Sequence, residues 1–418
     1  MSTPTGADTA GLSPEDADAL LLSVVFDDEV RQDPVPVYRR LIEESPHWKS
    51  SFGLTVLARY DDCLQYLRSP KWGRPESDMD LPPGLSGGSR FADDSATMLF
   101  LNPPDHTRIR SLVSRAFTPR RVDLLRPRID AMLQPILDEV AETGQVDIMS
   151  ALAIPFPVAV ISELLGVPQE RAGDFLGLVR DMTAAIDAAA DEAARARAEA
   201  AAFELAGFFA ELIVEKKAAP DEGLFSAMIE VEAEGDRLSE EELIANIMLL
   251  YAAGFETTSN LIGNGLLALL RHPDQLARLR ADRSLMGSAI MEILRYDSPV
   301  QLNVRTALTD DVLFGEPVGR GTQTMILQGS GNHDPAAYDQ PERFDVGRFA
   351  ADGVPAPLSF GWGAHHCLGA HLARAEGEII FDAILDRFST IELVGDEPRY
   401  RPSFTLRGLG QMNLSVSG

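Results

Sequence analysis

A single cysteine near the C-terminal end of the chain stands in a loop rich in glycine and histidine. Cys367 lies in the stretch 359–369 (SFGWGAHHCLG), and residues 370–384, which have helical character, follow at once. Glycine lets a backbone turn tightly and approach another group closely. A thiolate at the start of a helix is stabilised by the helix dipole and by free backbone N–H groups. The loop is therefore predicted to hold one deprotonated sulfur against a large flat group.

This loop resembles the haem-binding loop of the cytochrome P450 family. Every fixed position of that signature is present, in the order Phe360, Gly361, Gly363, His365, Cys367 and Gly369. The resemblance implies that Cys367 is the axial ligand of the iron of haem b. It also implies that the cofactor is contacted by Phe360, Gly361, His365 and Gly369.

Other roles for a lone cysteine fit this loop less well. Structural zinc takes several Cys or His ligands at fixed spacing, whereas this loop supplies one sulfur. Covalent attachment of haem requires the pattern C-x-x-C-H, which the sequence lacks. A buried free cysteine in a glycine-rich turn is the remaining alternative, and a match at six fixed positions argues against it.

A second motif lies in the middle of the longest helical pattern, residues 239–271, which opens with the capping sequence SEEE. Residues 253–258 read AGFETT, so small side chains share one helix face with hydroxyls. A carboxylate inside a helix is costly to bury unless it is paired. Threonine hydroxyls bond back to carbonyls one turn earlier and loosen the helix. These properties suggest a local proton path, and a capped hydroxyl cluster at a helix crossing is the alternative.

The same stretch resembles the oxygen-activation motif of the cytochrome P450 family, a small residue followed by Gly-x-acid-Thr. The resemblance implies that Glu256 and Thr257 deliver protons to iron-bound dioxygen. It also implies that Ala253 and Gly254 lie close to the haem.

Two cationic side chains four residues apart, His106 and Arg110, are expected on one face of a helix. Such a face can present two donors to a pair of carboxylates, although a solvated basic face is the alternative. The family resemblance assigns both residues, together with Arg305, to the haem propionates.

Between residues 106 and 122 the sequence contains no acidic residue but five arginines, among them Arg110 and Arg115. On a chain with a formal net charge of −27, such a strip is typical of a docking site for an acidic partner. The resemblance implies that this partner is a ferredoxin or flavodoxin-type electron donor, docking near Arg110 and Arg115.

Glu292 and Arg295 stand three residues apart on a predicted helix. Pairs at this spacing are usually surface ion pairs worth less than about 1 kcal/mol. Here they match the E-x-x-R motif of the family, and the resemblance implies a structural triad completed by Arg343. His333 stands where the family commonly has arginine, which predicts that a local ion pair is lost or depends on pH.

The resemblance places a substrate-facing lid within residues 69–94, a stretch rich in Pro, Gly and Ser. A moving cover is implied further along, before the long helix. The pocket walls that it implies are apolar, namely Leu249, Ala253, Val300, Leu302 and Phe404. Such walls are compatible with a steroid, a terpenoid, a fatty acid or a polyketide.

Composition narrows the setting in which this chemistry takes place. The net charge argues against nucleic acid and acidic membrane surfaces as partners. Two cysteines far apart, Cys63 and Cys367, indicate no disulfide framework, which is typical of a reducing cytoplasm. No secretory signal begins the chain, and the most apolar segment, 243–270, is interrupted by the polar run 256–260. We therefore expect the soluble bacterial type, without a membrane anchor.

The elements that position these residues are predicted to be mainly helical, with smaller β regions near residues 303–328 and 391–394. At 1.5 Å per residue, the helix over residues 239–271 would be about 50 Å long. The resemblance implies a cytochrome P450-like fold with the haem between this helix and the cysteine loop. We expect one domain, 33–418, preceded by a flexible arm, residues 1–32, because the arm is rich in Ser, Thr, Pro and Asp.

These expectations converge on a haem-thiolate monooxygenase that inserts one oxygen atom from O2 into an apolar small molecule. Its electrons would come from a separate ferredoxin and reductase. A peroxide-driven relative is one alternative, against which the pair Glu256 and Thr257 argues. A non-catalytic haem-based ligand or gas sensor is the other, although no additional output domain is visible in the sequence.

Overall fold

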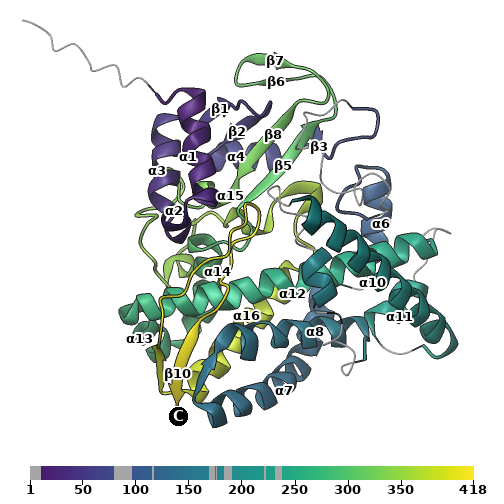
Figure 1. Ribbon diagram of the computed structural model, residues 1–418, viewed down its shortest axis with the longest axis vertical. Helices are drawn as coiled ribbons and strands as arrows, with labels where there is room; N and C mark the ends of the chain where they lie inside the picture. Colours follow the sequence, from purple (N-terminus) through teal and green to yellow (C-terminus); the bar gives the residue numbers. More distant parts are fainter. Residues whose placement is uncertain are drawn as a thin grey trace, which may run out of the picture.

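The computed structural model describes residues 11–79, 97–114, 117–168, 175, 177–182, 191–220, 223–230 and 238–418. Helices make up most of this part of the chain, and the largest sheet lies beside the N-terminal helices (Figure 1). The expected fold class, mainly helical with smaller β regions, is confirmed. The large helical region contains α6 (Asp105–Ser114), α7 (Pro119–Thr143), α8 (Pro155–Leu165), α10 (Glu192–Ala218), α11 (Leu224–Glu230), α12 (Glu240–Arg271), α13 (Pro273–Ala281), α14 (Met286–Tyr296) and α16 (Ala370–Arg387).

Helix α12 is the longest element and crosses the middle of the molecule (Figure 1). Its 32 residues correspond to a length of about 48 Å. The predicted cap is present, because the Ser239 hydroxyl accepts from the Glu242 N–H while the Glu242 carboxylate accepts from the Ser239 N–H. No helix in the described ranges combines the length and the apolar character needed to cross a membrane.

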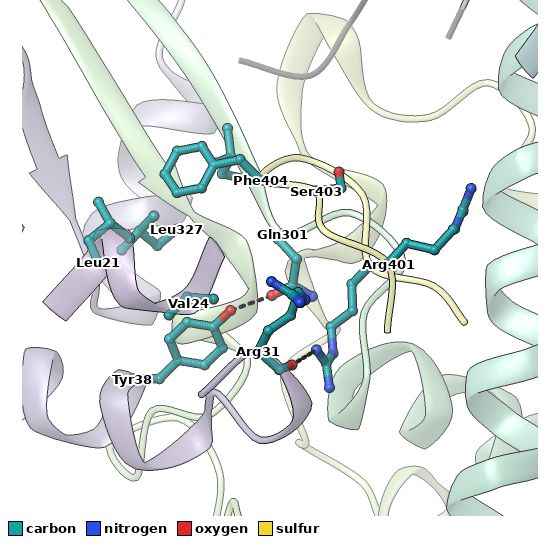
Figure 2. A pocket seen from close by; sticks show the side chains of 11 residues that line it. Leu21, Val24, Arg31, Tyr38, Gln301, Leu327, Arg401, Ser403 and Phe404 are labelled. Carbon is teal, nitrogen blue, oxygen red and sulfur yellow. Dashed lines mark hydrogen bonds between the residues drawn. The ribbon is translucent and has the colours of Figure 1, made fainter. Parts of the chain in front are cut away.

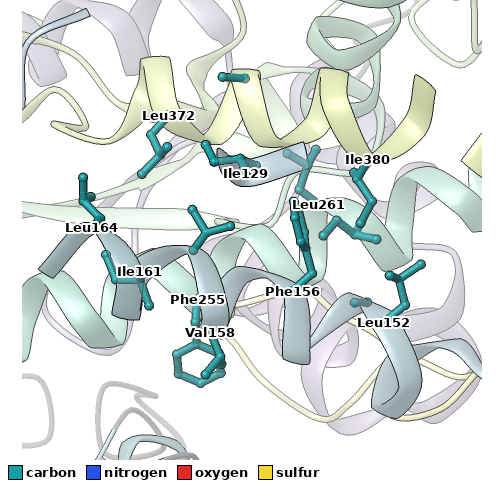
Figure 3. Close-up of a cluster of buried hydrophobic side chains, with 14 of the residues drawn as sticks. Ile129, Leu152, Phe156, Val158, Ile161, Leu164, Phe255, Leu261, Leu372 and Ile380 are labelled. Carbon is teal, nitrogen blue, oxygen red and sulfur yellow. The ribbon is translucent and has the colours of Figure 1, made fainter. Parts of the chain in front are cut away.

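The main hydrophobic core lies where α8, α12 and α16 meet. Figure 3 shows Phe156 and Ile161 of α8 on one side and Leu372 and Ile380 of α16 on the other, with Leu261 of α12 among them. All five side chains are buried. This packing holds the middle of α12 at a fixed place relative to the start of α16, which directly follows the cysteine loop.

The largest sheet has five strands in the order β1-β2-β8-β5-β3. β2 and β8 are parallel, and the other neighbouring pairs are antiparallel. β8 is buried along its whole length, as expected for a central strand. The strands are β1 (His47–Lys49), β2 (Thr55–Leu57), β3 (Trp72–Gly73), β5 (Leu302–Ala307) and β8 (Gln323–Leu327).

Two smaller sheets and several short helices complete the described fold. A three-stranded sheet joins β4 (Gln145–Asp147), β10 (Asn413–Ser417) and β9 (Thr390–Leu393). A hairpin joins β6 (Asp311–Leu313) and β7 (Glu316–Val318). The short helices are α4 (Tyr60–Arg68), α15 (Gln328–Gly331), a π-helical turn (Met149–Ala153) and four 3₁₀ turns (Arg283–Leu285, Arg348–Ala350, Leu358–Phe360 and Gly363–His365).

The N-terminal segment requires a correction, because part of the expected arm is ordered helix. α1 (Pro14–Phe26) and α2 (Asp28–Gln32) precede α3 (Val35–Glu44). Ser13 caps α1 with its side chain, and Ala17 and Leu21, one turn apart, are both buried. They pack with Leu302 and Leu327 of the large sheet. The prediction relied on overall composition and overlooked apolar residues at helical spacing. Burial of this apolar stripe orders the segment.

Candidate active site

The cysteine loop folds back on itself between two short turns and α16. Gly361 and Gly363 have φ values of 61° and 74°, which side chains other than glycine rarely adopt. A Cβ atom at Gly363 would lie 2.6 Å from the carbonyl oxygen of Leu67, so this position also needs the space. The Cys367 N–H donates to the carbonyl of Phe360 at 2.9 Å and closes the loop. The tight turn and close approach predicted from the glycines are confirmed.

The Cys367 side chain lies next to the start of α16 and is accessible. Burial raises the pKa of its thiol, while the backbone N–H of Gly369 and the guanidinium of Arg110 act in the opposite direction. Burial is the larger of these opposing effects. Bonding of the sulfur to a metal cation would supply the missing stabilisation, since metal ligation requires the deprotonated form.

Cationic and imidazole side chains from three separate elements meet beside this loop. His106 and Arg110 come from α6, Arg305 from β5 and His365 from the loop itself. The rings of His106 and His365 lie with their centres 4.3 Å apart, and Arg110 donates to the carbonyl of His366 at 2.5 Å. The structure thus brings together the sequence-predicted donors His106, Arg110, Arg305 and His365.

The electrostatics of this cluster are those of a site built for an anion. Burial and, to a lesser extent, the neighbouring arginines lower the pKa of His106 to about 4 and that of His365 to about 2. Burial also lowers the pKa of Arg305. Both ring nitrogens of the buried His106 lack a hydrogen-bond partner. Within the described ranges no carboxylate forms a salt bridge with His106, Arg110 or Arg305. Unpartnered donors and uncompensated cations fit the two propionates of a haem.

Arg74 is a member of this cluster that sequence reasoning missed. Its Nη1 donates to the carbonyl of Val304 at 3.3 Å, and its Nε is buried without a partner. Asn102 fixes its backbone, because the Asn102 side chain accepts from the Arg74 N–H and donates to the Arg74 carbonyl, both at 2.8 Å. No motif marks Arg74, which follows a two-residue strand. The segment that was expected to form a lid continues into residues 80–96, outside the described residues.

The motif in the middle of α12 carries a series of hydroxyls bonded to the helix. Thr257 donates to the carbonyl of Ala253 at 2.7 Å and Thr258 to that of Gly254 at 2.9 Å. Ala253 is exposed in the middle of an otherwise largely buried helix, which fits a face left open for a ligand. A Cβ atom at Gly254 would lie 3.0 Å from Cδ1 of Ile161, so this glycine also lets α8 approach α12.

Glu256 is the acid of this motif, and its carboxylate is mostly buried. One oxygen, Oε1, lies 3.2 Å from Nη2 of Arg401 in the C-terminal region. The other oxygen, Oε2, is buried and has no hydrogen-bond partner. A buried carboxylate that keeps one oxygen unpartnered has capacity to accept or hold a proton through an ordered water.

The structural triad around Glu292 differs from the sequence-based expectation in one member. Arg295 donates to Glu292 from Nε and Nη2, both at 2.8 Å, and the two side chains are fully buried. The second cation is Arg348, whose Nε lies 3.0 Å from Glu292. Arg343 was the wrong choice, because it offers its backbone carbonyl to Arg295 and Arg348 while the residue itself is exposed.

Two of the five expected pocket walls line one cavity. Leu302 and Phe404 line a cavity of about 30 Å³ together with Leu21 of α1 (Figure 2). Leu249 instead packs against the main core, and Val300 forms an isolated bridge with Leu406. Leu249, Ala253 and Val300 are not among the residues that line this cavity.

His333 is buried and uncharged near neutral pH. Burial and the neighbouring Arg295 together lower the pKa of its imidazole to about 3. Its Nδ1 lies 3.0 Å from the carbonyl of Gly329, which makes it the donor and leaves Nε2 as an unpartnered acceptor. Of the two outcomes expected for this position, the structure supports the loss of an ion pair.

Comparison with known proteins gives a consistent result. A family model described as Cytochrome P450 matches residues 86–412. The chain is 39% identical over 406 residues to Cytochrome P450 107B1 of Saccharopolyspora erythraea, covering 93% of this chain and 96% of the relative. It is also 39% identical over 399 residues to the vitamin D(3) 25-hydroxylase of Pseudonocardia autotrophica, covering 92% and 94%. The crystal structure of P450BioI in complex with hexadec-9Z-enoic acid ligated acyl carrier protein superposes with a TM-score of 0.84 at 32% identity, covering 93% of this chain and 99% of that one. The chain therefore belongs to the cytochrome P450 family and is a haem-thiolate monooxygenase with haem b as its cofactor.

Proposed function

We propose that this protein inserts one atom of O2 into an apolar small molecule and takes its electrons from a separate ferredoxin or flavodoxin-type protein. The observation that carries the proposal is the joint placement of three features. These are an accessible cysteine in a tight loop, a cluster of cations that no carboxylate of the described residues pairs with, and an acid–threonine pair in the middle of α12. The first two features suit the cofactor, and the third suits controlled proton delivery.

Each group has a distinct task in this proposal. Bound through the Cys367 thiolate, the haem would supply the redox chemistry that cleaves the O–O bond. His106, Arg110, Arg305 and Arg74 would hold its propionates. Thr257, whose hydroxyl is oriented by the carbonyl of Ala253, and Glu256, with an unpartnered oxygen, would hold and pass protons.

The relatives indicate how broad the substrate class is. One is named as a vitamin D(3) hydroxylase, and one solved structure holds a fatty acyl chain on a carrier protein. Another relative is named for polyketide biosynthesis. These compounds share a large apolar body, in agreement with the apolar character of Leu302 and Phe404. We therefore propose an apolar substrate of the sterol, fatty acyl or polyketide type.

We propose a more exact position for the electron donor within the strip 106–122, which was predicted to bind it near Arg110 and Arg115. Arg110 is turned inward to the cysteine loop, and Arg108 is paired with Glu242 of α12. Arg115 lies outside the described residues. Arg120 and Arg121 at the start of α7 are exposed and form no salt bridge within the described ranges. We place the docking site at this end of α7.

A reducing cytoplasm is the compartment in which we place the reaction. Both cysteines, Cys63 and Cys367, are free thiols. A separate soluble electron donor and a reduced axial thiol require such conditions.

A spectrum and a turnover assay test the proposal. The reduced holoprotein exposed to carbon monoxide should show the red-shifted band of a thiolate-ligated haem, and a band like that of imidazole-ligated haem would contradict it. Vitamin D3 and hexadec-9Z-enoic acid serve as probes of substrate binding. Product should form with ferredoxin, its reductase and NADPH. Product with hydrogen peroxide alone, and none with the electron donor, would establish a peroxide-driven enzyme instead. Normal reduction without product from any probe would favour a ligand sensor.

A further inference from the structure

We propose that Arg401 is a positioning residue that holds the proton-delivering carboxylate of Glu256, and that it does so from the same segment that forms part of the apolar pocket wall. The segment consists of residues 399–410 and is called the Arg401 segment below. The inference rests on the proposed function, in which Glu256 passes protons.

The contact between Arg401 and Glu256 joins two parts of the chain that are far apart in sequence. Nη2 of Arg401 lies 3.2 Å from Oε1 of Glu256 and 3.2 Å from Oδ1 of Asn260. The Glu256 side chain is only 12% exposed, and Arg401 is the cation with which it pairs among the described residues. Burying a carboxylate is costly unless a partner compensates it, and Arg401 is that partner here. Because Arg401 engages only Oε1, the unpartnered Oε2 stays available for proton transfer.

A polar stripe on α12 fixes the position of the Arg401 segment along the helix axis. Glu256, Asn260 and Asn264 follow one another at intervals of four residues, so they share one face. Asn264 donates to the carbonyl of Arg407 at 3.1 Å. A Cβ atom at Gly408 would lie 1.8 Å from Oδ1 of Asn260, which shows how closely the backbone approaches the helix there. A one-residue shift of the segment would therefore break the contact with Glu256.

The N-terminal helices hold the other side of the same segment. Arg31 of α2 donates to the carbonyl of Tyr400 at 3.3 Å, and the Tyr400 N–H donates to Gln32 at 2.8 Å. Arg399 forms an ion pair with Glu29 at 2.8 Å. Arg407 also donates to the carbonyl of Gln32 at 3.1 Å. The Arg401 segment is thus clamped between α2 and α12.

The cavity of about 30 Å³ connects this clamp to the pocket wall. Arg401, Ser403 and Phe404 all line it, together with Leu302 of β5. Figure 2 shows Arg401 directed away from Leu21 and Tyr38, whereas the Phe404 ring lies on the side of Leu21 and Leu327. An apolar substrate that packs against Phe404 therefore contacts the same segment that holds Glu256 in position.

Loss of the Arg401 contact should lower the fraction of electrons that end in product. Its effect on substrate binding should be smaller. With Glu256 unheld, protons would no longer be delivered in step with product formation. Two electrons and two protons would then reduce O2 to hydrogen peroxide, and no oxygen atom would reach the substrate. Removal of a positioned acid or base typically costs about a hundredfold or more, and a misplaced one costs less. We expect Arg401→Gln to lower product formed per NADPH about tenfold.

The activity test compares five variants of the holoenzyme with wild type. Each is assayed with whichever of the two probes, vitamin D3 or hexadec-9Z-enoic acid, binds more tightly to wild type. Arg401→Gln should divert electrons to hydrogen peroxide while the spectral Kd for the probe stays within twofold of wild type, a margin of about 0.4 kcal/mol. Arg401→Lys keeps the charge and should restore coupling. Arg39→Gln on α3, an exposed arginine outside the Arg401 segment that pairs with Glu342, is the matched control and should behave as wild type. The double variant of Arg401→Gln with Glu256→Gln should be no worse than Glu256→Gln alone.

Three results would overturn the proposal. These are coupling in Arg401→Gln equal to wild type, additive losses in the double variant, or a weakened Kd that accounts for the whole effect and makes Arg401 a binding residue. Hydrogen exchange adds a readout that needs no turnover. Glu256→Gln should raise amide exchange in residues 401–408, which are more than a hundred positions away in sequence. If no probe yields product, the proposed function fails, whereas the exchange experiment still decides whether Arg401 and Glu256 are coupled.

Discussion

At the scale of single residues, the arrangement around Glu292 shows what a buried charge requires. Glu292 accepts from Arg295 and Arg348 and also from the N–H of Asp345 at 2.9 Å. The Arg295 guanidinium in turn donates to the carbonyls of Asn332 and Pro341. A fully buried carboxylate with this many charged and backbone donors is compensated for its burial, and it fixes the surrounding turns.

Arg348 and Arg343 make a matched pair for testing this arrangement. Arg348→Ala leaves a buried carboxylate with one cation in place of two, so we expect the free energy of unfolding to fall by about 3 kcal/mol or more. Arg343→Ala removes an exposed side chain and should change it by about 0.5 kcal/mol or less. Urea denaturation followed by circular dichroism measures both. An equal loss in the free energy of unfolding from the two variants would show that Arg343, too, stabilises the triad.

His333 predicts a dependence of stability on pH. Its pKa is lowered to about 3 by burial and by Arg295, from about 6.5 in an unfolded chain. Between these two values the unfolded chain binds the extra proton, so the free energy of unfolding decreases as pH falls. The decrease is about 1.4 kcal/mol per pH unit for one such group.

Replacement of His333 by glutamine should remove the contribution of this one titrating group from the dependence of the free energy of unfolding on pH. Urea unfolding of wild type and His333→Gln between pH 4 and pH 7.5 measures it. Above about pH 7 the ring is neutral in both folded and unfolded chains, so the two curves should run parallel there. Parallel curves down to pH 4 would show that the ring is protonated equally in both states.

At the scale of elements, α1 and α2 connect the large sheet to the C-terminal region. Ala17, Leu21 and Val25 are buried at helical spacing, and Leu21 contacts the cluster that contains Leu302 and Leu327. Arg31 and Gln32 add hydrogen bonds to Tyr400. The helices therefore support both β5 and the Arg401 segment.

Truncation of one buried side chain tests this role. Leu21→Ala removes a side chain that is 3% exposed, so we expect a loss of about 2–5 kcal/mol in the free energy of unfolding. Phe26→Ala removes a side chain from a residue that is 73% exposed in the same helix and should cost little. Thermal unfolding of both variants provides the comparison. A neutral effect of Leu21→Ala would restore the interpretation of this segment as a loose arm.

At the scale of the whole molecule, the charge distribution governs how the electron donor approaches. The formal net charge is −27, so an acidic donor is repelled at long range and has to be attracted locally. Arg120 and Arg121 are exposed at the start of α7, in a region that holds no acid between residues 106 and 122. The basic strip of residues 106–122 therefore gives the acidic protein a region of positive charge.

Charge reversal at this region should slow electron transfer. We expect the double change Arg120→Glu and Arg121→Glu to reduce the second-order rate of reduction by ferredoxin about tenfold or more at low salt. The difference from wild type should shrink as ionic strength rises, because salt screens exposed charges. Stopped-flow reduction under carbon monoxide measures the rate. Arg39→Glu on α3 is the control, and an equal effect there would indicate net charge alone.

Features written in contiguous residues were predictable from the sequence by itself. The cysteine loop needs glycines at two left-handed positions within three residues, and Gly361 and Gly363 stand there. The cap at Ser239, the length of α12 and the Thr257 hydrogen bond are also local, because helix geometry determines them. For the same reason the fold class and the family followed from short motifs.

Contacts between distant segments were decided only by the tertiary structure. Arg348 replaces Arg343 because the turn after residue 343 points a different side chain at Glu292. Arg74 reaches the anion site only because β3 pairs with β5, and Arg401 reaches Glu256 only because the C-terminal segment packs on α12. An arginine side chain is long, and nothing in its sequence neighbourhood states which buried carboxylate or anion it meets. That choice depends on how strands and helices pack, which is why the partners of the charged groups had to be read from the folded chain.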